Sequence, residues 1–216
     1  MADNASNTSR MLALLAELRR EMNGVAADAM RSYGGQYGVN YGVAAHTIRE
    51  KASAIPHDHE FAEYLYKQDV RELRIAGLWI AEPERVTVDD LPFWVAGIIN
   101  SEVAEQAALA LFSHVECINE MLSEWSHSTN VLPCYAAMLA AARNNEHTDP
   151  DTAFGSLFRI VRNFPDNRLA GQGAVALLVS VAASDRDGVA RMIESLPDSP
   201  TAAYVRYEMS WRLETI

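Results

Sequence analysis

Two glutamates three residues apart, Glu102 and Glu105, form the carboxylate pair best suited to chemistry in this sequence of 216 residues. Residues three apart on a helix share one face, so both side chains would project in the same direction. In a buried cleft, one of them could have a raised pKa and act as a general acid or base. On a solvated surface, the helix dipole would favour the same pair near a helix start, in a capping role. Both roles fit the spacing.

Two other clusters carry side chains that could bind a metal or act as a nucleophile. Residues 57–60 (HDHE) are the densest group of metal-ligand types, but no Cys or His lies at zinc-site spacing from them. We therefore expect a loop entering a helix, with His57 or Asp58 near the N-cap, and no metal or other cofactor. Cys117 and His114 are three apart, but a nucleophile and its base also require an orienting group and an oxyanion hole. A buried thiol beside a helix-end histidine is the simpler interpretation.

The charge of the chain is acidic overall and unevenly distributed. The net charge is −11 and the isoelectric point is near 4.9, so the molecule should repel a polyanion at long range. Residues 86–150 hold nine acidic side chains and one basic side chain, Arg143. Residues 1–85 hold 10 basic and 12 acidic side chains, and residues 151–216 hold 7 and 8. Any basic surface is therefore expected in the N-terminal or C-terminal part.

Helical periodicity runs along nearly the whole chain, and the alternation typical of strands is missing. From His57 onward, the expected helices form five pairs, at 58–67 with 69–81, 87–99 with 101–113, 117–126 with 131–143, 150–162 with 168–182, and 186–195 with 201–214. A repeat of two helices, about 30 to 36 residues long, is typical of α-solenoids. We predict an all-α solenoid of stacked antiparallel helix pairs in a single domain. Residues 1–7 are expected to be disordered, 8–56 to form an N-terminal cap, and 57–216 to hold the five pairs.

The cysteines and the apolar runs predict a cytoplasmic location. Cys117 and Cys134 are isolated, and the N-terminus lacks a secretory apolar segment, so both thiols are expected to be reduced. The longest apolar run, residues 174–183, is about half as long as a bilayer span. We expect no disulfide and no membrane partner.

Short motifs along this helical array carry a family resemblance. From the N-terminal end they are Tyr41-Gly42-Val43 with Arg49, Leu65-Tyr66 with Glu72 and Arg74, Trp94 with residues 100–106 (NSEVAEQ), and residues 125–130 (WSHSTN). In their order, spacing and helical context, they resemble the signatures of the HEAT-like DNA alkylation repair proteins over most of residues 20–185.

The resemblance implies a basic groove that cradles duplex DNA. In active members, aromatic rings pack against an alkylated purine nucleotide, and a carboxylate stabilises the developing positive charge on the sugar. The catalytic aspartate of the family falls on Glu105, and the aromatic residue before it falls on Ser101. The arginine pair after Asn130 falls on Cys134 and Tyr135. The second tryptophan expected within residues 174–181 is absent, and the arginine after it is replaced by Ser180.

Two functions follow from this comparison. The first is a non-catalytic binding scaffold of the DNA alkylation repair family, which could bind damaged duplex DNA or a basic protein or peptide. The second is a divergent DNA glycosylase that excises N3- or N7-alkylated purines, with Glu105 and Glu102 as its carboxylates. Its DNA-contacting and lesion-contacting candidates would be Trp94, Arg49, Arg71, Arg74, Arg159, Arg162 and Arg168.

Overall fold

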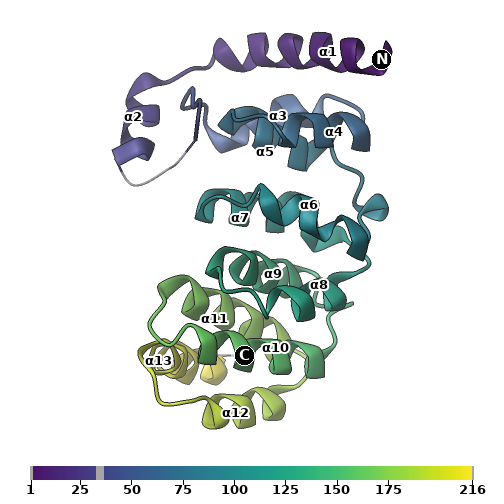
Figure 1. Ribbon diagram of the computed structural model, residues 1–216. Coiled ribbons are helices and arrows are strands. Elements are labelled where there is room, and N and C mark those ends of the chain that lie inside the picture. Colours follow the sequence, from purple (N-terminus) through teal and green to yellow (C-terminus); the bar gives the residue numbers. More distant parts are fainter. Residues whose placement is uncertain (1, 33–36, 216) are drawn as a thin grey trace. The chain divides into compact units, whose positions relative to one another are not determined.

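The computed structural model describes residues 2–32 and 37–215, and this part of the chain is all-α. It holds thirteen α-helices, three short 3-10 helices and no β-strand (Figure 1). Its extended pairing is limited to one isolated parallel bridge between Val39 and Val70. The predicted all-α class is confirmed. The helices group into two compact units, Met1–Arg85 and Val86–Ile216.

The first unit is built around α5. Its helices are α1 (Ala2–Arg19), α2 (Gly24–Ser32), α3 (Ala45–Ser53), α4 (His59–Tyr66) and α5 (Arg71–Ile80), followed by the 3-10 turn η1 (Pro83–Arg85). α5 packs against α4, α3 and α1, and all but one of its residues are buried, the exception being Trp79. Of the two N-cap candidates, His57 and Asp58, it is Asp58 that caps α4, where its carboxylate accepts a hydrogen bond from the Phe61 N–H at 3.0 Å.

The N-terminal segment differs from the expectation of a disordered tail. Residues 2–7 are helical and continue into the rest of α1. Just beyond them, Thr8 and Tyr64 share a hydrogen bond of 2.9 Å between their hydroxyls, and Arg10 donates to the Asn7 side chain at 3.2 Å and to Asp58 at 2.7 Å. These contacts fix the early turns of α1 to α4 and to its N-cap residue Asp58.

The second unit consists of helix pairs. Its α-helices are α6 (Leu91–Ala96), α7 (Ser101–Ala110), α8 (Ile118–Trp125), α9 (Val131–Arg143), α10 (Pro150–Asn163), α11 (Arg168–Ala182), α12 (Arg186–Ser195) and α13 (Pro200–Thr215), with 3-10 turns η2 (Val88–Asp90) and η3 (Phe112–His114). The second helix of each pair packs on the second helix of the next, in the order α7, α9, α11 and α13. The helices of this unit lie at the positions of the last four expected pairs, and α9, α11 and α12 span the expected residues.

Small residues allow these second helices to approach closely. A Cβ atom at Gly173 of α11 would lie 2.6 Å from the Met138 side chain and 3.2 Å from the Tyr135 ring of α9. Alanines occupy many of the other buried positions of α9, among them Ala136, Ala137 and Ala140. The row of second helices is therefore held by close packing of backbones. None of the helices described is long and apolar enough to cross a membrane.

Candidate functional site

Glu105 lies one turn into α7, and its carboxylate accepts a hydrogen bond of 3.0 Å from the hydroxyl of Tyr135 on α9. Glu105 is exposed, whereas Tyr135 is buried. Burial and the negative charge of Glu105 raise the pKa of Tyr135 to about 12. The phenol therefore stays protonated at neutral pH and keeps donating to the carboxylate.

Glu102 occupies the first turn of the same helix and is partly exposed. The N-cap of α7 is Asn100, whose side chain accepts from the Val103 N–H at 2.9 Å. A carboxylate in this first turn interacts favourably with the helix dipole, whereas the N-cap itself is Asn100. Within residues 2–32 and 37–215, no group of three or more His, Cys, Asp or Glu side chains is placed to hold a metal ion.

The assignment of Trp94 as a ring platform for a damaged base is wrong. Its side chain is 0% exposed, and its ring packs edge-on against Phe93 with ring centroids 5.0 Å apart. Helical spacing alone could not show which face of α6 carries the ring. Trp94 is a core residue of the second unit.

Three of the predicted phosphate-binding arginines belong to the first unit, and two of these are buried. Arg71 is 0% exposed, and Arg74, at 8%, donates to the backbone carbonyl of Gln68 at 3.2 Å. Neither guanidinium is placed to bind a phosphate, so these two assignments are wrong. Arg49 is exposed, with its guanidinium 4.6 Å from the centre of the Trp79 ring, where a cation–π contact holds it.

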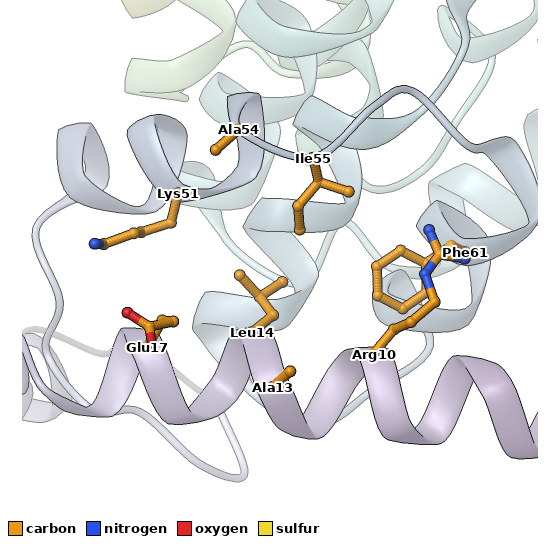
Figure 2. Close-up of a pocket in the computed structure, with 8 residues that line it drawn as sticks. All are labelled: Arg10, Ala13, Leu14, Glu17, Lys51, Ala54, Ile55 and Phe61. Atoms are coloured by element: carbon orange, nitrogen blue, oxygen red, sulfur yellow. The ribbon is translucent and has the colours of Figure 1, made fainter.

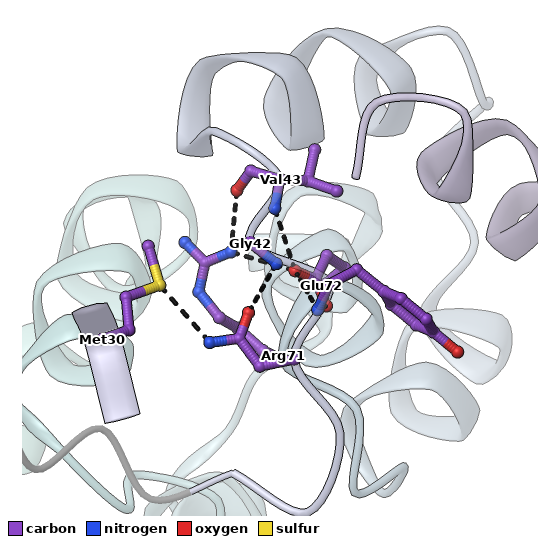
Figure 3. Close-up of polar contacts among 7 residues, drawn as sticks. Met30, Gly42, Val43, Arg71 and Glu72 are labelled. Atoms are coloured by element: carbon purple, nitrogen blue, oxygen red, sulfur yellow. Dashed lines mark hydrogen bonds and ion pairs between the residues drawn. The ribbon is translucent and has the colours of Figure 1, made fainter. Parts of the chain in front are cut away.

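The buried charges of α5 explain the Tyr-Gly-Val motif at residues 41–43. The Glu72 carboxylate accepts hydrogen bonds from the N–H groups of Tyr41 (3.1 Å) and Val43 (3.2 Å), as Figure 3 illustrates. Arg71 donates to the Val43 carbonyl at 2.7 Å and to Glu72 at 3.1 Å. The intervening Gly42 has φ +69°, and a Cβ there would lie 2.1 Å from the Asn23 carbonyl oxygen. These contacts of the motif residues therefore fix a chain segment in place.

The remaining predicted arginines gather at the turn between α10 and α11. Arg159 is partly exposed and donates to the Ser126 hydroxyl at 2.6 Å. Arg162 and Arg168 are exposed, and neither makes a hydrogen bond or an ion pair within the described part of the chain. One acidic residue, Asp166, lies in the same turn. The turn therefore carries a local excess of positive charge.

Several contacts place the N-terminal ends of the second helices side by side. The Glu105–Tyr135 bond joins α7 and α9 one turn after the start of each helix, and the Tyr135 ring lies beside Gly173 in α11. The N–H of Asn167, just before α11, donates to the Thr201 hydroxyl at the start of α13 at 2.9 Å. We call this row of helix starts, together with Arg159, Arg162 and Arg168, the helix-start edge.

Asparagine caps recur along the helix-start edge, and sequence reasoning missed them. Asn100, Asn130 and Asn167 are the N-caps of α7, α9 and α11, and each side chain accepts a backbone N–H bond of its own helix. Their recurrence at the starts of α7, α9 and α11 is a signal that the sequence already contained. Helix N-termini carry partial positive charge and favour anions.

The chain is similar to known proteins both in fold and in sequence. A solved structure with a TM-score of 0.71 and 15% identity covers 93% of this chain and 94% of its own. It is described as one of "a new family of proteins related to the HEAT-like repeat DNA glycosylases with affinity for branched DNA structures". The stacked helix pairs are therefore a HEAT-like repeat fold. The chain belongs to the DNA alkylation repair enzyme family, whose model matches residues 14–209. No curated protein matches the sequence.

Proposed function

We propose that this protein is a non-catalytic scaffold of the DNA alkylation repair family that binds DNA through the helix-start edge of its second unit. The observation that carries the proposal is the pair Arg162 and Arg168, which are exposed and make no internal hydrogen bond or ion pair in the described chain. They flank a turn that leads into the Asn-capped start of α11. Unpaired arginines beside a helix N-terminus are well suited to phosphate oxygens.

The surroundings of Glu105 favour binding without base excision. Excision of an alkylated purine needs a carboxylate that is free to face the sugar and a ring that faces the base. The Glu105 carboxylate accepts the Tyr135 hydrogen bond, Ser101 has no ring, and Trp94 is buried. The positions that resemble the family's arginine pair hold Cys134 and Tyr135, and both side chains are buried.

Branched or distorted DNA is the preferred partner in this proposal. The affinity for branched DNA in the description of the similar structure supports this choice. The net charge of −11 repels a long duplex, which would have to be bound through charge along its length. It therefore favours a DNA partner that is held by a few local contacts. Contacts with two or three phosphates predict a shallow salt dependence, with a slope of about −2 to −3 in a plot of log affinity against log salt.

The test is binding of labelled four-way junction and matched linear duplex at several salt concentrations. We expect the junction to bind more tightly than the duplex. The double variant Arg162→Glu/Arg168→Glu should lose most of this binding, with the slope reduced by about 2. Arg20→Glu/Arg31→Glu is the matched control, because it makes the same charge change at exposed arginines of the first unit. Equal binding by both double variants would overturn the proposed surface.

A divergent glycosylase is the second candidate, and the exposed carboxylate of Glu105, one turn into α7, favours it. Base release from duplex containing N7-methylguanine or N3-methyladenine separates the two candidates. The scaffold predicts no release above the buffer rate, by either the wild type or Glu105→Gln. Release by the wild type that Glu105→Gln abolishes would establish the enzyme instead. Failure to bind any DNA at low salt would shift the search for a partner to basic proteins.

A further inference from the structure

A cavity of about 510 Å³ lies in the first unit, between α1 and the segment that joins α3 to α4. Its wall is mainly apolar, and Figure 2 shows Leu14, Ile55 and Phe61 directed toward it from three different segments. Ala13 and Ala54 add small side chains that leave the space open. The volume is within the range of small-molecule sites, which are mostly apolar with a few polar groups that orient the ligand.

The charged side chains around the cavity do not all have partners. Arg10 is paired with Asp58 at 2.7 Å, and Glu17 is paired with Arg20 at 2.6 Å. Lys51, at the end of α3, makes no ion pair or hydrogen bond within the described residues. Among the described residues, Lys51 is therefore the lining cation that has no ion pair, and it lies next to an apolar wall.

We propose that this cavity binds a small amphipathic anion, a carboxylate with an unbranched apolar chain. The chain would lie against Leu14, Ile55 and Phe61, and the carboxylate would pair with the ammonium group of Lys51. The choice rests on charge complementarity, because Lys51 is the lining cation that remains without a counter-ion. It is independent of the proposed DNA surface, since every lining residue belongs to the first unit.

Isothermal titration calorimetry of the full chain with hexanoate, octanoate and decanoate tests the proposal. We expect saturable binding of one decanoate, with affinity rising about threefold for each added methylene as more apolar surface is buried. Lys51→Gln should weaken decanoate binding about fivefold, as expected for loss of one partly exposed ion pair. Ala13→Trp should abolish binding by filling the cavity, provided that thermal unfolding shows the variant to be folded.

Lys67→Gln is the matched control, because Lys67 is the other lysine of the chain and lies outside the cavity, 4.0 Å from Glu63. It should bind decanoate like the wild type. In addition, decanoate should protect Lys51 but not Lys67 from acetylation, read by mass spectrometry. Absence of saturable binding, equal binding by Lys51→Gln and wild type, or equal affinity for decanol and decanoate would each overturn the proposal.

Discussion

Arg71 and Glu72 are chain neighbours whose side chains are both buried and meet at 3.1 Å, with exposed fractions of 1% and 0%. Adjacent residues on a helix usually point in different directions. Here both side chains turn toward the segment at residues 41–43, where Glu72 accepts N–H groups and Arg71 donates to a carbonyl. The pair thus satisfies backbone groups that would otherwise be buried without partners.

We expect Glu72→Gln to lower the free energy of unfolding by about 3–5 kcal/mol, because it leaves the Arg71 charge buried without its counter-charge. Urea unfolding followed by circular dichroism measures the effect. Glu60→Gln is the control, since Glu60 is an exposed residue in the first turn of α4 and should change stability by less than about 0.5 kcal/mol. Similar losses in the two variants would show that the buried pair contributes little.

Gly42→Ala should destabilise the protein by more than about 1 kcal/mol. The residue has φ +69°, and an added Cβ would approach the Asn23 carbonyl oxygen to 2.1 Å and the Ala27 nitrogen to 2.7 Å. Gly155, within α10, is the matched control because nothing lies within 4 Å of a Cβ there. Gly155→Ala should stabilise by about 0.5–1 kcal/mol through helix propensity. Urea unfolding of both variants should show changes in the free energy of unfolding that are opposite in sign. No change in this free energy for Gly42→Ala would refute the packing argument.

The helices and their pairing could be predicted from the sequence, because they depend on local periodicity and on prolines at junctions. The ends of α9 and α11 were predictable for that reason. The side of a helix that faces the core depends on contacts between distant segments. Trp94 and Arg71 were therefore assigned to a surface although both are fully buried.

The candidate site was predictable only in part, for a similar reason. Arg162 and Arg168 lie beside a turn that the proline and helix pattern already indicated, and both are exposed. By contrast, the hydrogen bond between Glu105 and Tyr135 joins residues thirty positions apart. Its formation depends on the stacking of α7 on α9, and on a glycine at position 173 that leaves room for the ring.

Tyr135→Phe should remove the hydrogen bond to Glu105 and lower stability at neutral pH by about 1 kcal/mol. In the wild type, the pKa of Tyr135 is raised from 10.0 to about 12 in the folded state. The folded state therefore holds this proton more tightly than the unfolded state does. The resulting stabilisation is fully present below pH 10 and is lost as the pH rises from 10 to 12.

The wild type should consequently lose more stability across this pH interval than Tyr135→Phe does. Urea unfolding of both proteins at several pH values measures the difference, and tyrosinate absorbance of the folded proteins shows which titration step is missing from the variant. Tyr64→Phe provides a control, because Tyr64 is a partly exposed tyrosine of the first unit. Parallel stability curves for the wild type and Tyr135→Phe would contradict the raised pKa.

Cys134→Arg tests whether the arginine expected from the family resemblance could be restored. Cys134 is 0% exposed, and its thiol donates to the Trp125 carbonyl at 3.1 Å. Burial raises the pKa of this thiol to about 12, so a charged group is strongly disfavoured at this position. An arginine there would be both too large for the site and an unpaired buried charge. We expect a loss of at least about 4 kcal/mol, or failure to fold.

Cys134→Ser is the informative companion to this change, because it keeps the size and a donor to the Trp125 carbonyl. It should cost no more than about 1–2 kcal/mol, and it should leave junction binding unchanged, since position 134 lies beneath the surface. Wild-type stability of Cys134→Arg would show that the buried position can accommodate an arginine. A gain of base-release activity in this variant would show that a single substitution converts the scaffold into an enzyme. The packing of α9 against α7, α8 and α11 predicts the opposite, because the site is closed on all these sides.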